Sequence, residues 1–84
     1  MITLQSVQAA RARISPYVVR TPTVVQGRLT ELLGRPVVAK LELLQHAGSF
    51  KARGTTNRIA TLTPEARERG AITLSAGNAG QAYA

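Results

Sequence analysis

Residues 48–54, GSFKARG, contain Lys51, one of only two lysines in the chain. Ser49 is a good helix N-cap, which predicts that Lys51 lies in the first turn of a helix. The free amide hydrogens there place positive potential beside the amine, and burial beside Phe50 would add desolvation. Both effects favour the neutral amine, a nucleophile that can form a Schiff base with an aldehyde. A surface lysine is the alternative interpretation of this stretch alone.

The second stretch whose residues could bind a ligand is SAGNAGQ, residues 75–81, directly after the AITLS run. Its small residues allow close backbone approach, and amide hydrogens at the start of the next helix can bind a carboxylate or a phosphate. Asn78 adds a side-chain donor and acceptor at the same place. An ordinary strand-to-helix turn capped by Asn78 would have the same pattern.

Taken together, SFKARG and SAGNAGQ resemble one known family. With RTPTVV and AKLELLQHAGSFKARG upstream, they have the order and spacing of the serine/threonine dehydratases, which are also called threonine ammonia-lyases. These are pyridoxal-phosphate enzymes of fold type II, with the tryptophan-synthase-β-like fold. The resemblance covers nearly the whole chain and implies an α/β architecture.

The resemblance also implies a role for individual residues. Lys51 matches the lysine that forms a Schiff base with pyridoxal 5'-phosphate and then moves the substrate Cα proton. Phe50 matches an aromatic residue beside the cofactor ring, and Asn78 matches the asparagine that hydrogen-bonds the cofactor's phenolic oxygen. The loop whose amides hold the substrate carboxylate corresponds to Ser75, Ala76 and Gly77.

The implied reaction is β-elimination from L-threonine or L-serine, which yields a 2-oxo acid and ammonia. Ala76 stands where racemases of the family have a second serine, which speaks against racemisation, and Ala79 stands where many relatives have histidine. The family's glycine-rich phosphate-binding loop and the partner of the pyridine nitrogen are not in this sequence. We therefore expect residues 1–84 to be a single incomplete domain, the N-terminal part of a dehydratase, that is inactive alone.

Two alternatives stay open from the sequence. Threonine synthase or another β-replacing enzyme of the same fold type would share the lysine and asparagine stretches. A small basic nucleic-acid-binding protein would account for the net charge of +7. The arginines are scattered, however, and only three aromatic residues could stack on bases, so a nucleic-acid partner is not expected.

Composition limits the remaining possibilities. The chain has no cysteine, which excludes disulfides and thiolate metal sites, and 44% of its residues are hydrophobic, which is typical of a globular protein. No targeting segment or membrane span is expected, and the cytoplasm is the default location. The resemblance implies a small amino-acid substrate and a homo-oligomeric complete enzyme.

Periodicity and capping signals predict the elements that carry these stretches. Apolar residues recur at helical spacing over residues 3–14, and Thr63, Pro64 and Gly70 delimit a short helix. Arg53 would steady the lysine helix or form a salt bridge. The other predicted elements are a β-branched run at 21–25 followed by a Leu-rich turn or short helix, strands at 36–44 and 71–75, and helices at 50–60 and after residue 77. This order predicts a parallel α/β sheet.

Overall fold

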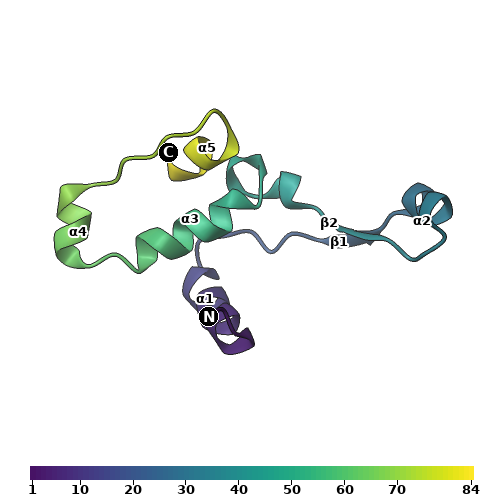
Figure 1. Cartoon of the computed structure of the whole chain (residues 1–84), viewed down its shortest axis with the longest axis horizontal. Helices are drawn as coiled ribbons and strands as arrows, with labels where there is room; N and C mark the ends of the chain where they lie inside the picture. The colour runs from purple at the N-terminus through teal and green to yellow at the C-terminus, as the bar shows by residue number, and fades with distance from the viewer.

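Helix α3 (Lys51–Ala60) lies at the centre of the computed structural model, which describes residues 1–84 (Figure 1). Helix α1 (Leu4–Ile14) and helix α5 (Asn78–Tyr83) both contact α3. A two-stranded arm extends from one end of this group, and α4 (Pro64–Arg69) lies at the other end. The molecule is therefore elongated, with extents of 52 × 32 × 24 Å.

The arm is an antiparallel pair of short strands. Strand β1 (Thr23–Val25) pairs with β2 (Val38–Lys40), and Val24 lies opposite Ala39. Helix α2 (Gly27–Leu33) lies at the tip of the arm and does not cross over the sheet (Figure 1). The predicted parallel sheet is therefore wrong for this chain, because a parallel pair needs a crossover connection that packs on a sheet face.

The predicted strand at 36–44 is also shorter than expected. Only three residues pair in β2, and the chain then continues through two 3-10 turns, η1 (Glu42–Leu44) and η2 (His46–Gly48). Ala47 and Gly48 have φ angles of 59° and 72°. These left-handed conformations lie in the turn immediately before the helix that carries Lys51.

The predicted helices are confirmed, with small shifts at their ends. Thr3 caps α1, and the Thr63 hydroxyl accepts a hydrogen bond from the Ala66 amide, 3.1 Å away, at the start of α4. Helix α3 begins at Lys51, whose amide donates to the Ser49 hydroxyl at 3.4 Å. Ser49 thus lies one residue before the N-cap position but still receives an otherwise free amide of the first turn.

Residues 71–75 do not form the predicted strand. They connect α4 to α5 without a helix or strand, and Ile72 and Leu74 are 101% and 100% exposed. The sequence pattern is that of a strand, but a strand needs a neighbouring strand to hydrogen-bond, and no strand of this chain pairs with these residues.

The interior is small and mostly polar. Ile14 and Ala52 are the only buried hydrophobic residues, and the buried polar residues are Thr21, Gln45, Ser49 and Thr55. Each buried side-chain polar atom has a hydrogen-bond partner. The order near α3 therefore depends on specific hydrogen bonds more than on an apolar core. Every helix is too short or too polar to cross a lipid bilayer.

Candidate active site

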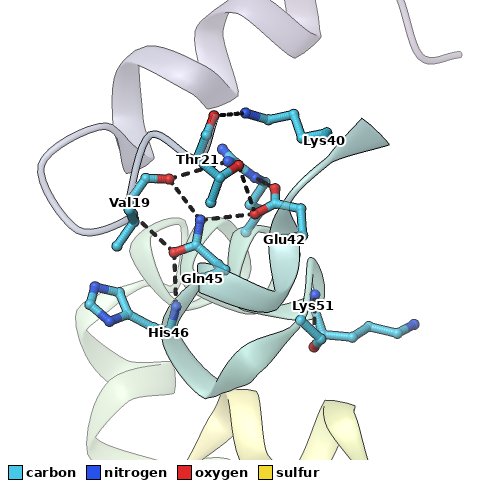
Figure 2. A network of polar contacts seen from close by, with 9 residues as sticks. Val19, Thr21, Lys40, Glu42, Gln45, His46 and Lys51 are labelled. Atoms are coloured by element: carbon cyan, nitrogen blue, oxygen red, sulfur yellow. Dashed lines mark hydrogen bonds and ion pairs between the residues drawn. The ribbon is translucent and has the colours of Figure 1, made fainter. Parts of the chain in front are cut away.

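The amine of Lys51 is exposed at the start of α3. Its Nζ lies 5.2 Å from the centroid of the Phe50 ring, which is within cation–π range, and Phe50 is itself 61% exposed. In Figure 2 the Lys51 side chain points away from the polar residues drawn around it. The predicted burial of Lys51 beside Phe50 is wrong, because nothing in this chain covers the pair.

Lys40, the second lysine, has a different environment. Its Nζ donates a hydrogen bond to the Thr21 carbonyl oxygen, 2.6 Å away. The Nζ of Lys51 has no hydrogen bond and no ion pair within the chain. Of the two lysine amines, only that of Lys51 is free of such a partner.

The fold brings the two sequence stretches together at the level of elements. Helices α3 and α5 pack against each other, and α5 also contacts η2, which directly precedes Ser49. The Thr55 hydroxyl lies 3.4 Å from the Ala82 carbonyl oxygen and links the two helices. Asn78, the first residue of α5, is exposed, and its side chain has no hydrogen-bond partner in the chain.

No principal cavity of this chain joins Lys51 to Asn78. The larger one, about 1030 Å³, lies between α1, residues 18–23 and Arg53, and is lined by neither residue. The smaller one, about 260 Å³, lies between residues 71–73 and α5 and is also lined by neither. Adjacent elements are therefore present, but neither of these two cavities encloses both side chains.

The loop before α5 is folded onto itself. The Gly77 amide donates to the Ser75 hydroxyl at 3.1 Å, while the amides of Ser75 and Ala76 have no partner. A Cβ atom built on Gly80 would lie only 3.3 Å from the Ser75 Cβ, so this loop lies close against α5. Two of the three predicted carboxylate-binding amides are thus free, and the third is occupied by Ser75.

A polar network that the sequence analysis missed lies on the side of the turns from which the Lys51 side chain points away (Figure 2). The Gln45 side chain, in a residue only 4% exposed, accepts from the Val19 amide at 2.9 Å and donates to the Val19 carbonyl at 2.8 Å. It also accepts from the His46 amide at 3.1 Å and donates to Glu42 at 3.3 Å. One side chain thus joins the segment at residue 19 to the turns before α3.

Arg53 connects α3 to the same network. Its guanidinium forms an ion pair with Glu42 and donates to the Val19 carbonyl at 3.3 Å, which confirms the salt-bridge alternative for Arg53. The hydrogen bond from Arg53 lowers the pKa of Glu42, against the opposing effect of partial burial. Glu42 is the only acidic residue between Glu31 and Glu65, which was the available sequence signal for this pair.

The same arrangement occurs in known proteins. A family model described as "Pyridoxal-phosphate dependent enzyme" matches residues 14–84. This chain belongs to the pyridoxal-phosphate dependent enzymes. The serine racemase of Dictyostelium discoideum gives a TM-score of 0.89 at 40% identity, covering 98% of this chain and 27% of that structure. The likeness includes both stretches and the elements between them.

Two curated proteins are similar in sequence to this member of the pyridoxal-phosphate dependent enzymes. The putative threonine dehydratase of Sinorhizobium fredii is 49% identical over 81 residues, which are 96% of this chain and 24% of that protein. The L-threonine ammonia-lyase of Thermotoga maritima is 42% identical over 84 residues and is covered to 21%. The chain therefore spans about a quarter of the relatives it matches.

The side chains present fit part of the family's cofactor. A free amine at Lys51 suits its aldehyde carbon, and the unpaired carboxamide of Asn78 suits a phenolic oxygen. The chain has no cluster of acidic, histidine or cysteine residues that could hold a metal ion. These residues can therefore support the reaction of an amine, that of Lys51, with an aldehyde.

Proposed function

We propose that this chain supplies the lysine and asparagine stretches of a pyridoxal-phosphate dependent dehydratase acting on L-threonine or L-serine. The products of that reaction are a 2-oxo acid and ammonia. The observation that carries the proposal is the free amine of Lys51 on α3, beside the helix that begins with Asn78, in a chain of this family. The cofactor, when bound, draws electron density away from the substrate Cα–H bond.

Each residue of the chain has a distinct part in this proposal. The Lys51 Nζ would hold the cofactor at its aldehyde carbon and would take up the Cα proton of the substrate. The Asn78 carboxamide would hydrogen-bond the cofactor's phenolic oxygen, and Phe50 would lie beside the cofactor ring. The free amides of Ser75 and Ala76 hold the substrate carboxylate, and Gly77 joins them when the Ser75 hydroxyl turns away.

Elimination is favoured over racemisation by the side chain at position 76. Racemisation needs a group that returns a proton to the opposite face of Cα, and Ala76 has none to offer. The Ser75 hydroxyl nearby accepts a hydrogen bond from the Gly77 amide. The solved serine racemase that resembles this chain is therefore a guide to its fold and not to its reaction.

Reductive labelling tests the role of Lys51, with Lys40 as a control inside the same chain. The chain is incubated with pyridoxal 5'-phosphate, reduced with sodium borohydride, digested and mapped by mass spectrometry. We expect label on Lys51 in clear excess over Lys40, whose amine is held by the Thr21 carbonyl. Equal labelling of both lysines, or excess on Lys40, would contradict the proposal.

The same preparation tests whether the chain works alone. We expect no release of 2-oxobutanoate from L-threonine, because no enclosed pocket holds Lys51 and Asn78 together. A cofactor absorbance band that survives dialysis, together with threonine turnover, would show that these 84 residues are sufficient.

A further inference from the structure

The larger cavity of the chain, which we call the basic cavity, carries an excess of positive charge. It has a volume of about 1030 Å³ and lies between α1, residues 18–23 and Arg53. Four cationic side chains and one carboxylate, that of Glu42, line it. Because Arg53 forms an ion pair with Glu42, three positive charges stay uncompensated, and a cavity of this charge attracts anions. The uncompensated cations are Arg11, Arg20 and Lys40.

These three cations come from two walls of the basic cavity. Arg11 belongs to α1, whereas Lys40 lies beside Arg20, because its Nζ donates to the carbonyl oxygen of the next residue, Thr21, at 2.6 Å (Figure 2). That carbonyl accepts the hydrogen bond without cancelling the charge of Lys40. The side chains of Arg11 and Arg20 have no hydrogen bond or ion pair within the chain. Both guanidinium groups therefore keep their donors for a ligand.

Main-chain donors at the same wall also lack partners. Thr21 lines the basic cavity and is 4% exposed, yet its amide donates no hydrogen bond in the chain, and neither does the amide of Arg20. The preceding amide, that of Val19, is satisfied by the Gln45 side chain at 2.9 Å. An unpartnered amide in a buried residue is unusual in folded proteins, so these two amides indicate an acceptor from outside the chain.

The rest of the α1 wall is aliphatic. Val7, Ala10 and Ile14 recur there at helical spacing, and Val18 and Pro22 line the same cavity. An aliphatic surface favours a hydrocarbon chain, whereas the fork of a guanidinium group matches a carboxylate with two parallel hydrogen bonds. The basic cavity is therefore complementary to a molecule with an aliphatic middle and a carboxylate at each end.

We propose that the basic cavity is a binding site for an aliphatic dicarboxylate. One carboxylate of the ligand pairs with the Arg11 guanidinium on α1. The other is held by Arg20, by the Lys40 amine and by the free amides of residues 20 and 21, while the hydrocarbon chain lies against Val7 and Ile14. Neither Lys51 nor Asn78 lines this cavity, so the site is separate from the one in the proposed function.

Titration of the isotope-labelled chain with glutarate, followed by proton–nitrogen NMR, tests the proposal. Acetate and inorganic phosphate are the comparison ligands, each at the same ionic strength. We expect saturable shifts of the amides of residues 20 and 21, with glutarate bound about tenfold or more tightly than acetate, because acetate reaches one cationic wall only. Phosphate bound as tightly as glutarate would overturn the dicarboxylate, and the absence of saturable shifts would overturn the site.

Two variants and a matched control locate the ligand. Arg11→Gln and Arg20→Gln should each weaken glutarate binding about tenfold or more, because each removes a hydrogen-bonded charge pair. The rest of the amide spectrum should be unchanged, since neither side chain is bonded within the chain. Arg35→Gln makes the same change in net charge outside the basic cavity and should leave the affinity unchanged. Full affinity in Arg11→Gln, or an equal loss in Arg35→Gln, would overturn the two-walled site.

The map of shifts separates this proposal from the proposed function. The free amides of Ser75 and Ala76 offer a carboxylate another place to bind. Glutarate shifts confined to residues 75–77 would overturn the basic cavity as a dicarboxylate site and leave the function standing. Saturable shifts at residues 20 and 21 in a chain that takes no cofactor label at Lys51 would contradict the function alone.

Discussion

At the scale of residues, the side chains with unpartnered functional groups are not the ones that hold the segments together. Lys51 and Asn78 carry functional groups with no partners, whereas Gln45, Glu42 and Arg53 use theirs to hold segments together. The sequence motifs identified the first kind because free reactive groups occur at characteristic positions. Of the second kind, the sequence analysis named only Arg53, as a salt-bridge residue. Gln45 was missed, since its partner is the backbone of Val19, which no side-chain pattern reveals.

The ion pair between Glu42 and Arg53 predicts that the stability of α3 falls at acid pH. Because Arg53 lowers the pKa of Glu42 in the folded chain, the pair stabilises α3 above the ordinary pKa of 4.5. That stabilisation is lost as the pH falls through the lowered pKa of the folded state. Carbon-13 NMR titration of the Glu42 carboxyl should give a midpoint below its ordinary value.

The matched variants for this titration are at position 53. Arg53→Ala should return the Glu42 midpoint toward its ordinary value, because the donating guanidinium is gone. Arg53→Lys keeps the charge and should retain part of the shift. An unchanged midpoint in Arg53→Ala would show that another group controls the ionisation of Glu42.

At the scale of elements, sequence signals were accurate where an element depends on its own residues. Helix α4 begins after its capping Thr63, and α5 begins after the glycine-containing turn, as predicted. Helix α1 was predicted from its apolar periodicity, and the structure adds Thr3 as its cap. The strands were predicted less well because a strand is defined by its neighbour. The run at residues 21–25 pairs with β2, while residues 71–75 pair with no strand. The pairing is antiparallel because the chain turns back through α2 between the two strands.

The short helix α4 provides a test of this local control. It has six residues and packs little against the rest of the chain (Figure 1), so its cap decides its population. Thr63→Ala removes the hydroxyl that accepts from Ala66 and should cost about 1 kcal/mol. Residue-resolved hydrogen exchange should then show about fivefold faster exchange in α4.

The matched control is the other capping threonine. Thr3→Ala should accelerate exchange in α1 only, because its capping hydrogen bonds are with Ser6. If either variant accelerated exchange in both helices, the two would form one cooperative unit and local control would be the wrong description.

At the scale of the whole molecule, the chain is more expanded than a domain of its length. Its radius of gyration is 15.9 Å, whereas a compact domain of this size has about 12 Å. The resemblance to the dehydratases predicted an incomplete fold, and the exposed hydrophobic residues agree with it. The motifs do not predict which strand would pair with residues 71–75, because residues 1–84 contain no such strand.

Small-angle X-ray scattering and calorimetry test this description of the isolated chain. We expect a radius of gyration near 16 Å or larger and a broad thermal transition without a sharp heat-capacity peak, since little apolar area is buried. A radius near 12 Å with a sharp peak would mean that the chain closes its own core.

The clamp of Gln45 on Val19 also protects the chain against misassembly. A side-chain amide that binds both the N–H and the C=O of one residue occupies the groups that a stray β-strand would use. Neither main-chain group of residue 19 is therefore left for pairing with another strand. Replacing Gln45 would open both groups to another strand, even though the amine of Lys51 is untouched.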